Sequence, residues 1–165
     1  MDVDESLSFT QADTSTDIKR RVQEVRSKAI MLLARRDHSF QELEFKLSRF
    51  FSDEVLVQEQ LQNLADEGLQ SDFRFTEIMI RSSLSKSHGL SRIKNTLRAK
   101  GISGAMIEKA FSELEIDWLE QLKQLSLRKY GDRPCEDDKE KARRIRFFQY
   151  RGYAMSDIYT VLAKG

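Results

Sequence analysis

Two histidines, His38 and His88, are the residues of this chain best suited to binding a metal ion or transferring a proton. Such a site needs several groups that converge on one point, because one imidazole supplies a single ligand or proton acceptor. No cysteine or carboxylate cluster stands at ligand spacing around either histidine. Each histidine directly precedes a predicted helix N-cap, where its ring can pack on Leu43 or Ile93 in the first turn. We therefore interpret both histidines as structural.

Motifs of the common enzyme classes do not occur in the sequence. It contains no Gly-rich phosphate loop, nucleophile elbow or zinc-binding pattern. Asp72 and Arg74 lie near the start of a predicted helix. We interpret both as structural: Asp72 is favoured there by the helix dipole, and Arg74 can bridge to a neighbouring helix. The single Cys135 cannot form an internal disulfide. We expect no enzymatic activity, no catalytic residue, and no cofactor or metal.

Basic side chains instead point to an anionic partner, either DNA phosphates or an acidic protein surface. The segment "KEKARRIRFFQYR", residues 139–151, contains one acid, and a second basic segment covers residues 18–36. The alternative is that these are ordinary solvated helix faces. Aromatic residues beside the charges (Phe147, Phe148 and Tyr150) could stack on bases, although Ile145 and Phe148 share a stripe typical of core. The basic residues are Lys139, Lys141, Arg143, Arg144, Arg146 and Arg151, and Lys19, Arg20, Arg21, Arg26, Lys28, Arg35 and Arg36.

The overall composition favours a helical protein that is not globally basic. Of its 165 residues 39% are hydrophobic and 33% charged, with one proline, seven glycines and a formal net charge of +1. The N-terminal "MDVDESLSFTQADTSTD" carries only acidic charges, which is unlike a signal or transit peptide. No apolar run reaches the length of a membrane span. We expect a cytoplasmic protein.

Apolar periodicity predicts helices along the whole chain after a disordered acidic leader of residues 1–16. Stripes such as Ile18–Val22–Val25–Ala29–Leu32 and Leu43–Leu47–Phe50 repeat at helical spacing. Ser39 with Glu42 forms a predicted capping box. No segment alternates with period 2, so we expect no strand. The predicted helices run approximately over residues 18–36, 40–50, 54–68, 72–87, 90–101, 103–114, 118–129, 139–151 and 154–163.

The helices fall into three groups that share a register. The spacing between equivalent positions is 50 residues and then 65, which predicts a repeated structural unit rather than a repeated active site. We therefore predict an all-α fold, an elongated tandem array of three three-helix repeats, with boundaries at residues 17–68, 69–116 and 117–165. Equivalent positions are Ile30, Ile80 and Ile145; Arg36, Lys86 and Arg151; His38, His88 and Tyr153; Leu43, Ile93 and Ile158; and Leu47, Leu97 and Leu162.

Three separated blocks in this order resemble the RecX family, bacterial regulators of the RecA recombinase. The central block is "GLQSDFRF", Arg81 and "HGLSRIKNTLRAKGIS"; the flanking blocks are "ARRDHSFQELEFKL" and "YRGYAMSDIYTVL". The resemblance covers about residues 18–163. Leu90 stands where the family commonly has proline, and Ser71 where an acid is usual. Both replacements suit a helix start.

The resemblance implies tandem three-helix repeats and a regulatory function. Members of this family bind RecA filaments on single-stranded DNA, and inhibit ATP hydrolysis, strand exchange and filament extension. In this way they modulate recombination, repair and the SOS response. The partner is then the RecA filament, with possible direct contact to single- or double-stranded DNA and none to a membrane.

Two alternatives remain open at this point: a protein that binds DNA directly through its basic helices, and a helical adaptor for an unrelated partner. If the protein is a regulator of RecA filaments, we expect it to contact its partner through the basic residues that recur at the helix-to-helix turns and through the basic segment near the C-terminus. Phe75, Ile80, Ile93 and Leu97 are expected in the core. The expected contact residues are Arg36, Lys86, Arg151, Arg143, Arg144 and Arg146.

Overall fold

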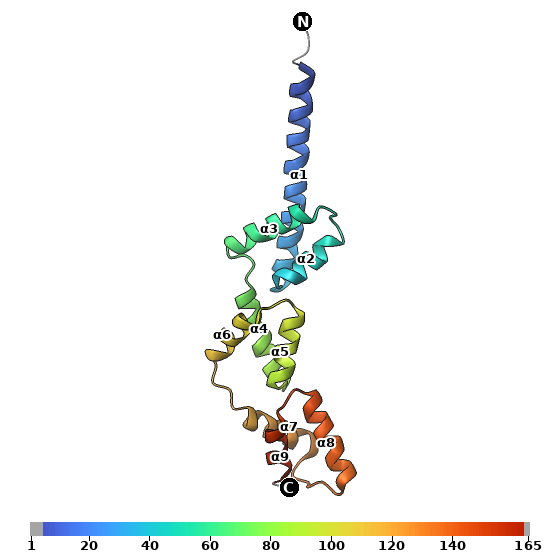
Figure 1. Ribbon diagram of the computed structural model, residues 1–165, viewed down its shortest axis with the longest axis vertical. Coiled ribbons are helices and arrows are strands. Elements are labelled where there is room, and N and C mark those ends of the chain that lie inside the picture. Colours follow the sequence, from blue (N-terminus) through green and yellow to red (C-terminus); the bar gives the residue numbers. More distant parts are fainter. Residues whose placement is uncertain (1–4, 164–165) are drawn as a thin grey trace. The chain divides into compact units, whose positions relative to one another are not determined.

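The chain is all-α in the part described by its computed structural model, which covers residues 5–163, with side chains from residue 14 onward (Figure 1). Nine helices and no strand occur within this range, as the sequence predicts. None of these helices is both long and apolar enough to cross a membrane. The helices are α1 (Glu5–Arg35), α2 (Phe40–Ser48), α3 (Glu54–Asp66), α4 (Asp72–Ser85), α5 (Leu90–Ala99), α6 (Gly104–Ser112), α7 (Trp118–Tyr130), α8 (Asp138–Tyr150) and α9 (Met155–Ala163).

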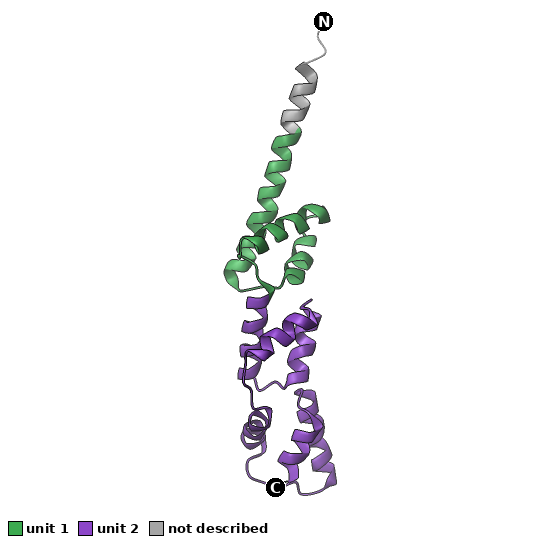
Figure 2. Ribbon diagram, turned by 60° about the vertical axis from the view of Figure 1, so that its left-hand side comes forward, with its two compact units in different colours: residues 1–72 green, residues 73–165 purple. Residues whose placement is uncertain are grey.

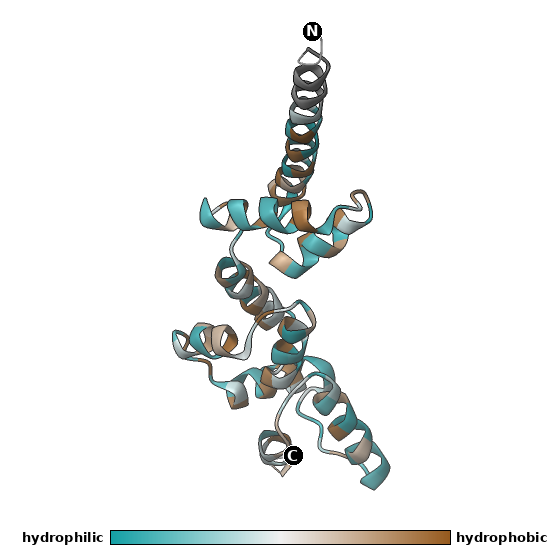
Figure 3. Cartoon of the chain, turned by 45° about the horizontal axis from the view of Figure 1, so that its top comes forward, coloured by the Kyte–Doolittle hydropathy of each residue, from teal (hydrophilic) through white to brown (hydrophobic). Residues whose placement is uncertain are grey.

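The chain divides into two compact units, residues 1–72 and 73–165 (Figure 2). Unit 1 contains α1–α3 and unit 2 contains the groups α4–α6 and α7–α9, with α4 beginning at the boundary. Each three-helix group has its own buried apolar cluster. Brown and teal segments alternate along the helices in Figure 3, as expected where a helix buries only one face. The boundaries of three repeats stay a prediction.

Unit 1 packs three helices around aliphatic side chains at helical spacing. The predicted capping box at the start of α2 is present: Ser39 Oγ accepts from the Glu42 amide at 3.1 Å, and the Glu42 carboxylate accepts from the Ser39 amide at 3.2 Å. Asp53 caps α3 by accepting from the Leu56 amide at 3.1 Å. Local side chains therefore satisfy amides that would otherwise lack partners. The buried cluster is Val25, Ala29, Leu43, Leu47, Val57, Leu61 and Leu64.

Two residues of the predicted stripes lie at the surface instead. Phe50 is 64% exposed because α2 ends at Ser48, before the stripe reaches it. Its ring is covered by the Lys28 ammonium, 4.4 Å from the ring centroid. Ile18 is 51% exposed because it precedes the part of α1 that contributes to the core, which begins with Val25. Apolar periodicity alone therefore extends both predicted stripes beyond the residues that are buried in the structure.

The N-terminal part of α1 differs from the predicted disordered leader. Residues 1–4 of that leader lie outside the described residues, and residues 5–16 belong to α1 in the structure. The first 35 residues contain neither glycine nor proline, so nothing in the local chemistry interrupts the helix.

Unit 2 contains two clusters, one for each of its helix groups. The predicted core residues Phe75, Ile80, Ile93 and Leu97 are all buried in the first cluster, which confirms the prediction. Trp118, at the start of α7, packs against both clusters. It therefore links the two groups within this unit. The second cluster consists of Leu122, Leu125, Phe148, Tyr153 and Ile158.

Candidate functional site

Two turns of unit 2 contact each other through backbone hydrogen bonds. The turn between α4 and α5 meets the turn between α8 and α9. The Gly89 amide donates to the Arg151 carbonyl at 2.7 Å. The amide and hydroxyl of Ser91 both donate to the Gly152 carbonyl, at 3.2 and 3.0 Å. The Tyr153 hydroxyl donates to the Ser87 carbonyl at 2.9 Å, and the two turns are thus fixed to each other.

The contact requires a glycine on each side. A Cβ atom on Gly89 would lie 2.4 Å from the carbonyl carbon of Gly152. A Cβ atom on Gly152, whose φ is +98°, would lie 2.5 Å from the Cβ of Arg92. Neither side chain has room, since contacts below about 3 Å force the backbone to move. The close approach therefore positions Arg92 directly against the end of α8.

The same contact replaces the side-chain cap of α5. Gly89 is the N-cap of α5 and offers no side-chain acceptor, so the carbonyls of Arg151 and Gly152 accept from the N-terminal amides instead. In the first helix group this duty falls on Ser39 and on Glu42, the third residue of α2. Position 92 is equivalent to position 42 and carries an arginine. Because the cap of α5 comes from α8, this position is free to be basic.

Positive charge gathers at the two turns. The pKa of His88 is lowered, first by burial and then by the charges of Arg92, Arg151 and Lys86, and no carboxylate among the described residues opposes this effect. The Arg151 guanidinium donates to the Lys86 carbonyl, and the Arg128 guanidinium donates to Ser87 Oγ. We call this set the basic junction: Lys86, His88, Arg92, Arg128 and Arg151. It can hold an anionic group such as a carboxylate or a phosphate.

The three predicted turn residues belong to different units of the chain. Lys86 and Arg151 lie together in the basic junction. Arg36 lies in unit 1, where its guanidinium pairs with the Glu42 carboxylate at 3.2 Å and donates to the Asp37 carbonyl at 2.8 Å. The charge of Arg36 is thus partly neutralised within its own helix group. The roles of Lys86, Arg151 and Arg36 in partner binding stay a prediction.

Arg144 was predicted beside Arg143 and Arg146 as a surface contact, and the structure contradicts this placement. Its side chain is buried, with the residue only 4% exposed. The guanidinium pairs with Glu140 at 2.6 Å, donates to the Arg133 carbonyl at 3.0 Å and lies 4.4 Å from the Tyr130 ring centroid. Arg144 therefore holds the loop before α8 against the helix.

Arg143 and Arg146 on α8 are exposed, and their role in partner binding stays a prediction. Sequence reasoning missed Arg92 and Arg128 as members of the basic junction. Arg92 had a detectable signal, because the equivalent positions in the other two groups are the acids Glu42 and Asp157. Arg128 had none, since its proximity depends on packing 41 residues away.

His38 makes more contacts than the predicted hydrophobic packing. Its Nδ1 lies 3.0 Å from the Arg36 carbonyl and its Nε2 lies 2.9 Å from Lys46 Nζ. This pattern fits a neutral ring that donates from Nδ1 and accepts at Nε2. The pKa of His38 is lowered, mainly because the ring is buried. Among the described side chains, no three histidine, cysteine or acidic residues are grouped to hold a metal.

Asp72 also has a role that its sequence position did not reveal. Its carboxylate accepts from the Phe40 amide at 2.8 Å and from the Gln70 side chain at 2.9 Å. Gln70 in turn donates to the His38 carbonyl at 3.3 Å. Asp72 thus serves the N-terminus of α2, in addition to standing at the start of α4.

Comparisons with known proteins agree on one family. The family models "RecX, second three-helix domain" and "RecX, third three-helix domain" match residues 71–110 and 115–162. A "Regulatory protein RecX" of Acinetobacter baylyi is 41% identical over 134 residues, which are 81% of this chain and 83% of that protein. One from Pseudomonas putida strain GB-1 is 37% identical over 139 residues, 84% of this chain and 89% of that protein.

Solved structures show the same fold. A crystal structure of a regulatory protein RecX aligns with a TM-score of 0.76 at 19% identity, covering 100% of this chain and 80% of that one. The crystal structure of RecX from Lactobacillus salivarius aligns with a TM-score of 0.70 at 20% identity, covering 87% and 95% of the two chains.

Proposed function

Because the chain belongs to the RecX family of regulatory proteins, we propose that it binds RecA filaments on single-stranded DNA and inhibits them. The activities inhibited are ATP hydrolysis, strand exchange and filament extension. Through them the protein modulates recombination, repair and the SOS response in the cytoplasm. It acts by binding and carries out no catalysis of its own.

The observation that carries this proposal is the basic junction. Lys86, Arg92 and Arg151 lie close enough to act together on the pKa of His88. Glycine packing and backbone hydrogen bonds fix the turns that carry them. A preorganised cationic surface binds an acidic partner with little loss of side-chain freedom. We place the RecA contact here, with Arg36 as a secondary contact in unit 1.

Inhibition needs no chemistry if the protein binds one state of the filament more tightly than another. A ligand shifts an equilibrium only by its difference in affinity for the two states. Binding to the filament end would stop extension with few molecules, whereas binding along the filament would need about one molecule per site. The two modes thus differ in stoichiometry.

The test is the single-stranded-DNA-dependent ATPase rate of the cognate RecA, titrated with this protein. We expect a dose-dependent fall in the rate. Inhibition well below one molecule per RecA would indicate end binding, and inhibition near equal amounts would indicate binding along the filament. An unchanged rate, together with no binding to the filament, would overturn the proposal.

Charge variants locate the contact. Lys86→Ala with Arg151→Ala should weaken filament binding, and Arg36→Ala should weaken it less, while far-UV circular dichroism stays unchanged. Lys141→Ala, an exposed lysine on α8 outside the junction, is the matched control. Equal affinity of the junction variants and the control would show that the junction residues are solvated charges only.

A further inference from the structure

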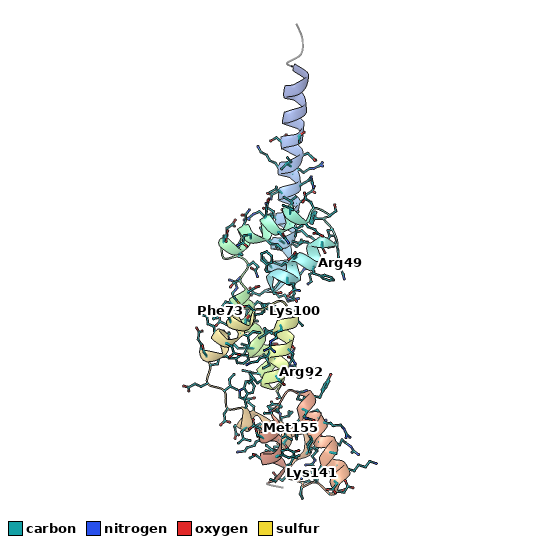
Figure 4. All side chains as sticks on the ribbon, in the orientation of Figure 1. Arg49, Phe73, Arg92, Lys100, Lys141 and Met155 are labelled. Carbon is teal, nitrogen blue, oxygen red and sulfur yellow. The ribbon has the colours of Figure 1, made fainter. Side chains whose placement is uncertain are left out.

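Tyr150, the last residue of α8, is an exposed aromatic residue among cations. It is 75% exposed, whereas Phe148 on the same helix is fully buried and Phe147 packs against the second cluster of unit 2. The Arg92 guanidinium lies 5.0 Å from the Tyr150 ring centroid. Figure 4 labels Arg92 on α5, the helix whose N-terminus meets the end of α8. Of the three aromatics in this segment, Tyr150 alone presents its ring to solvent.

The rest of this helix face is basic. Arg143, Arg146 and Tyr150 follow one another at i, i+3 and i+7, which places them on one side of the helix. All three are exposed. Residues 141–151 contain no acid. At 1.5 Å per residue this face extends for about 10 Å along the helix.

The position of the ring is fixed by the packing of the two turns. Gly152 follows Tyr150 by two residues, and a Cβ atom at this position would lie only 2.5 Å from the Cβ and 2.6 Å from the backbone nitrogen of Arg92. The hydrogen bonds of Ser91 to the Gly152 carbonyl hold the first turn of α5 against the last turn of α8. Arg92 therefore lies over the Tyr150 ring as a consequence of backbone contacts. A fixed aromatic surface loses little entropy when a flat ligand stacks on it.

We propose that this face of α8 binds single-stranded nucleic acid directly. One base stacks on the open face of Tyr150, with the Arg92 cation behind the ring. Arg143 and Arg146 contact the phosphates of the neighbouring nucleotides. Stacking of bases on aromatic side chains beside a basic track is the general mode of sequence-tolerant single-strand binding.

The exposed ring distinguishes this ligand from the acidic protein surface proposed for the basic junction. An unpaired base can stack on a solvent-exposed ring, whereas the carboxylates of an acidic surface offer no flat aromatic face to it. Duplex DNA keeps the faces of its bases stacked inside the helix, so its bases cannot reach Tyr150. The inference goes beyond the proposed function, because it requires no recombinase.

The test is fluorescence anisotropy of a labelled oligothymidine of about twenty nucleotides, with the full-length chain and without RecA. A second labelled oligomer of the same length carries abasic sites in place of the bases. Tyr150→Ala should weaken binding to oligothymidine by about tenfold and leave binding to the abasic oligomer unchanged. Tyr150→Phe should retain the affinity, since the ring remains.

Tyr159→Ala on α9 is the matched control, because it removes an exposed tyrosine outside the basic face. Arg143→Ala and Arg146→Ala should weaken binding to both oligomers and reduce the salt dependence of the affinity. Equal effects of Tyr150→Ala and Tyr159→Ala would overturn the proposal. So would tighter binding to a duplex or to polyglutamate than to oligothymidine. Because RecA is absent, these results are independent of the ATPase test.

Discussion

At the scale of single residues, the contacts of a buried polar side chain show which of its protonation states the packing accommodates. His38 accepts a hydrogen bond from Lys46 and is surrounded by its own helix group. Protonation of this ring would place two positive charges in contact. The neutral form is therefore built into the packing of unit 1.

We predict that unit 1 loses stability as the pH falls below about 6.5, the pKa of an unperturbed histidine. The folded pKa of His38 is lowered, so in this range the unfolded chain takes up a proton that the folded chain excludes. Above it the two states bind equally few protons and stability is full. The midpoint of thermal unfolding, followed by circular dichroism at about pH 7.5 and about pH 5.5, measures the effect.

His38→Gln should reduce the fall of the midpoint between these two pH values. His88→Gln is the comparison, because it leaves the contribution of His38 in place. An identical pH dependence in the wild type and His38→Gln would show that this ring contributes nothing to the acid sensitivity.

The glycine pair leads to a second prediction at this scale. Gly89→Ala should lower the free energy of unfolding of unit 2 by about 1–3 kcal/mol, because its Cβ would overlap the backbone of Gly152. Gly104→Ala is the control, since nothing lies within 4 Å of a Cβ at that position at the start of α6. Urea unfolding monitored by Trp118 fluorescence compares them. Equal stability of the two variants would contradict the observed close approach.

At the scale of helices, α8 shows how one element separates structural from binding charges. Arg144 faces inward to Glu140 and the Arg133 carbonyl, while Arg143 and Arg146 face outward. Arg144→Ala should therefore lower the free energy of unfolding, because it removes a buried side chain together with its hydrogen bond to the Arg133 carbonyl and its ion pair with Glu140. Arg146→Ala should change stability by less than about 0.5 kcal/mol. Urea unfolding measures both, and equal costs would show that the ion pair contributes little.

Helix α4 offers a matched pair for the core. Ile80 is fully buried, whereas Ile78 on the same helix is 43% exposed. Ile80→Ala should cost about 2–5 kcal/mol in the free energy of unfolding, and Ile78→Ala clearly less. Chemical denaturation of the two variants gives the comparison, and similar costs would mean that the face assigned to the core is wrong.

The helices and their cores were predictable because they depend on neighbours within a few residues. The capping box of Ser39 and Glu42 and the burial of Ile93 and Leu97 follow from spacing alone. Where a stripe ends was not predictable in the same way, and Phe50 was misplaced. Stripes stop where a helix turns away from its partners, and that depends on the tertiary packing.

The candidate site was predictable only in part. Lys86 and Arg151 were recognised from the repeated register, but their proximity depends on a contact between segments 65 residues apart. Arg144 was wrongly assigned to the surface because nothing in the local sequence distinguishes it from the exposed arginines Arg143 and Arg146. Its pairing with the Arg133 carbonyl becomes visible only when the preceding loop folds back.

At the scale of the whole molecule, the two helix groups of unit 2 are joined and should respond together. Trp118 packs against both clusters, and the turn contact adds backbone hydrogen bonds. Leu122→Ala in the third group should therefore reduce hydrogen-exchange protection in α4–α6 as well as in α7–α9. Mass spectrometry of exchanged peptides measures this. Loss of protection confined to α7–α9 would indicate that the groups open independently.

The cap of α5 also has a consequence for the order in which the chain is made. The capping bonds of α2 join residues three positions apart, so they can form as soon as that segment leaves the ribosome. Those of α5 wait for Gly152, 61 residues after Ser91. At about 5–20 residues per second, translation leaves the start of α5 uncapped for roughly 3–12 s. The N-terminal helix group can thus fold while the chain is being synthesised, whereas the second group is completed only when nearly all of the chain has emerged.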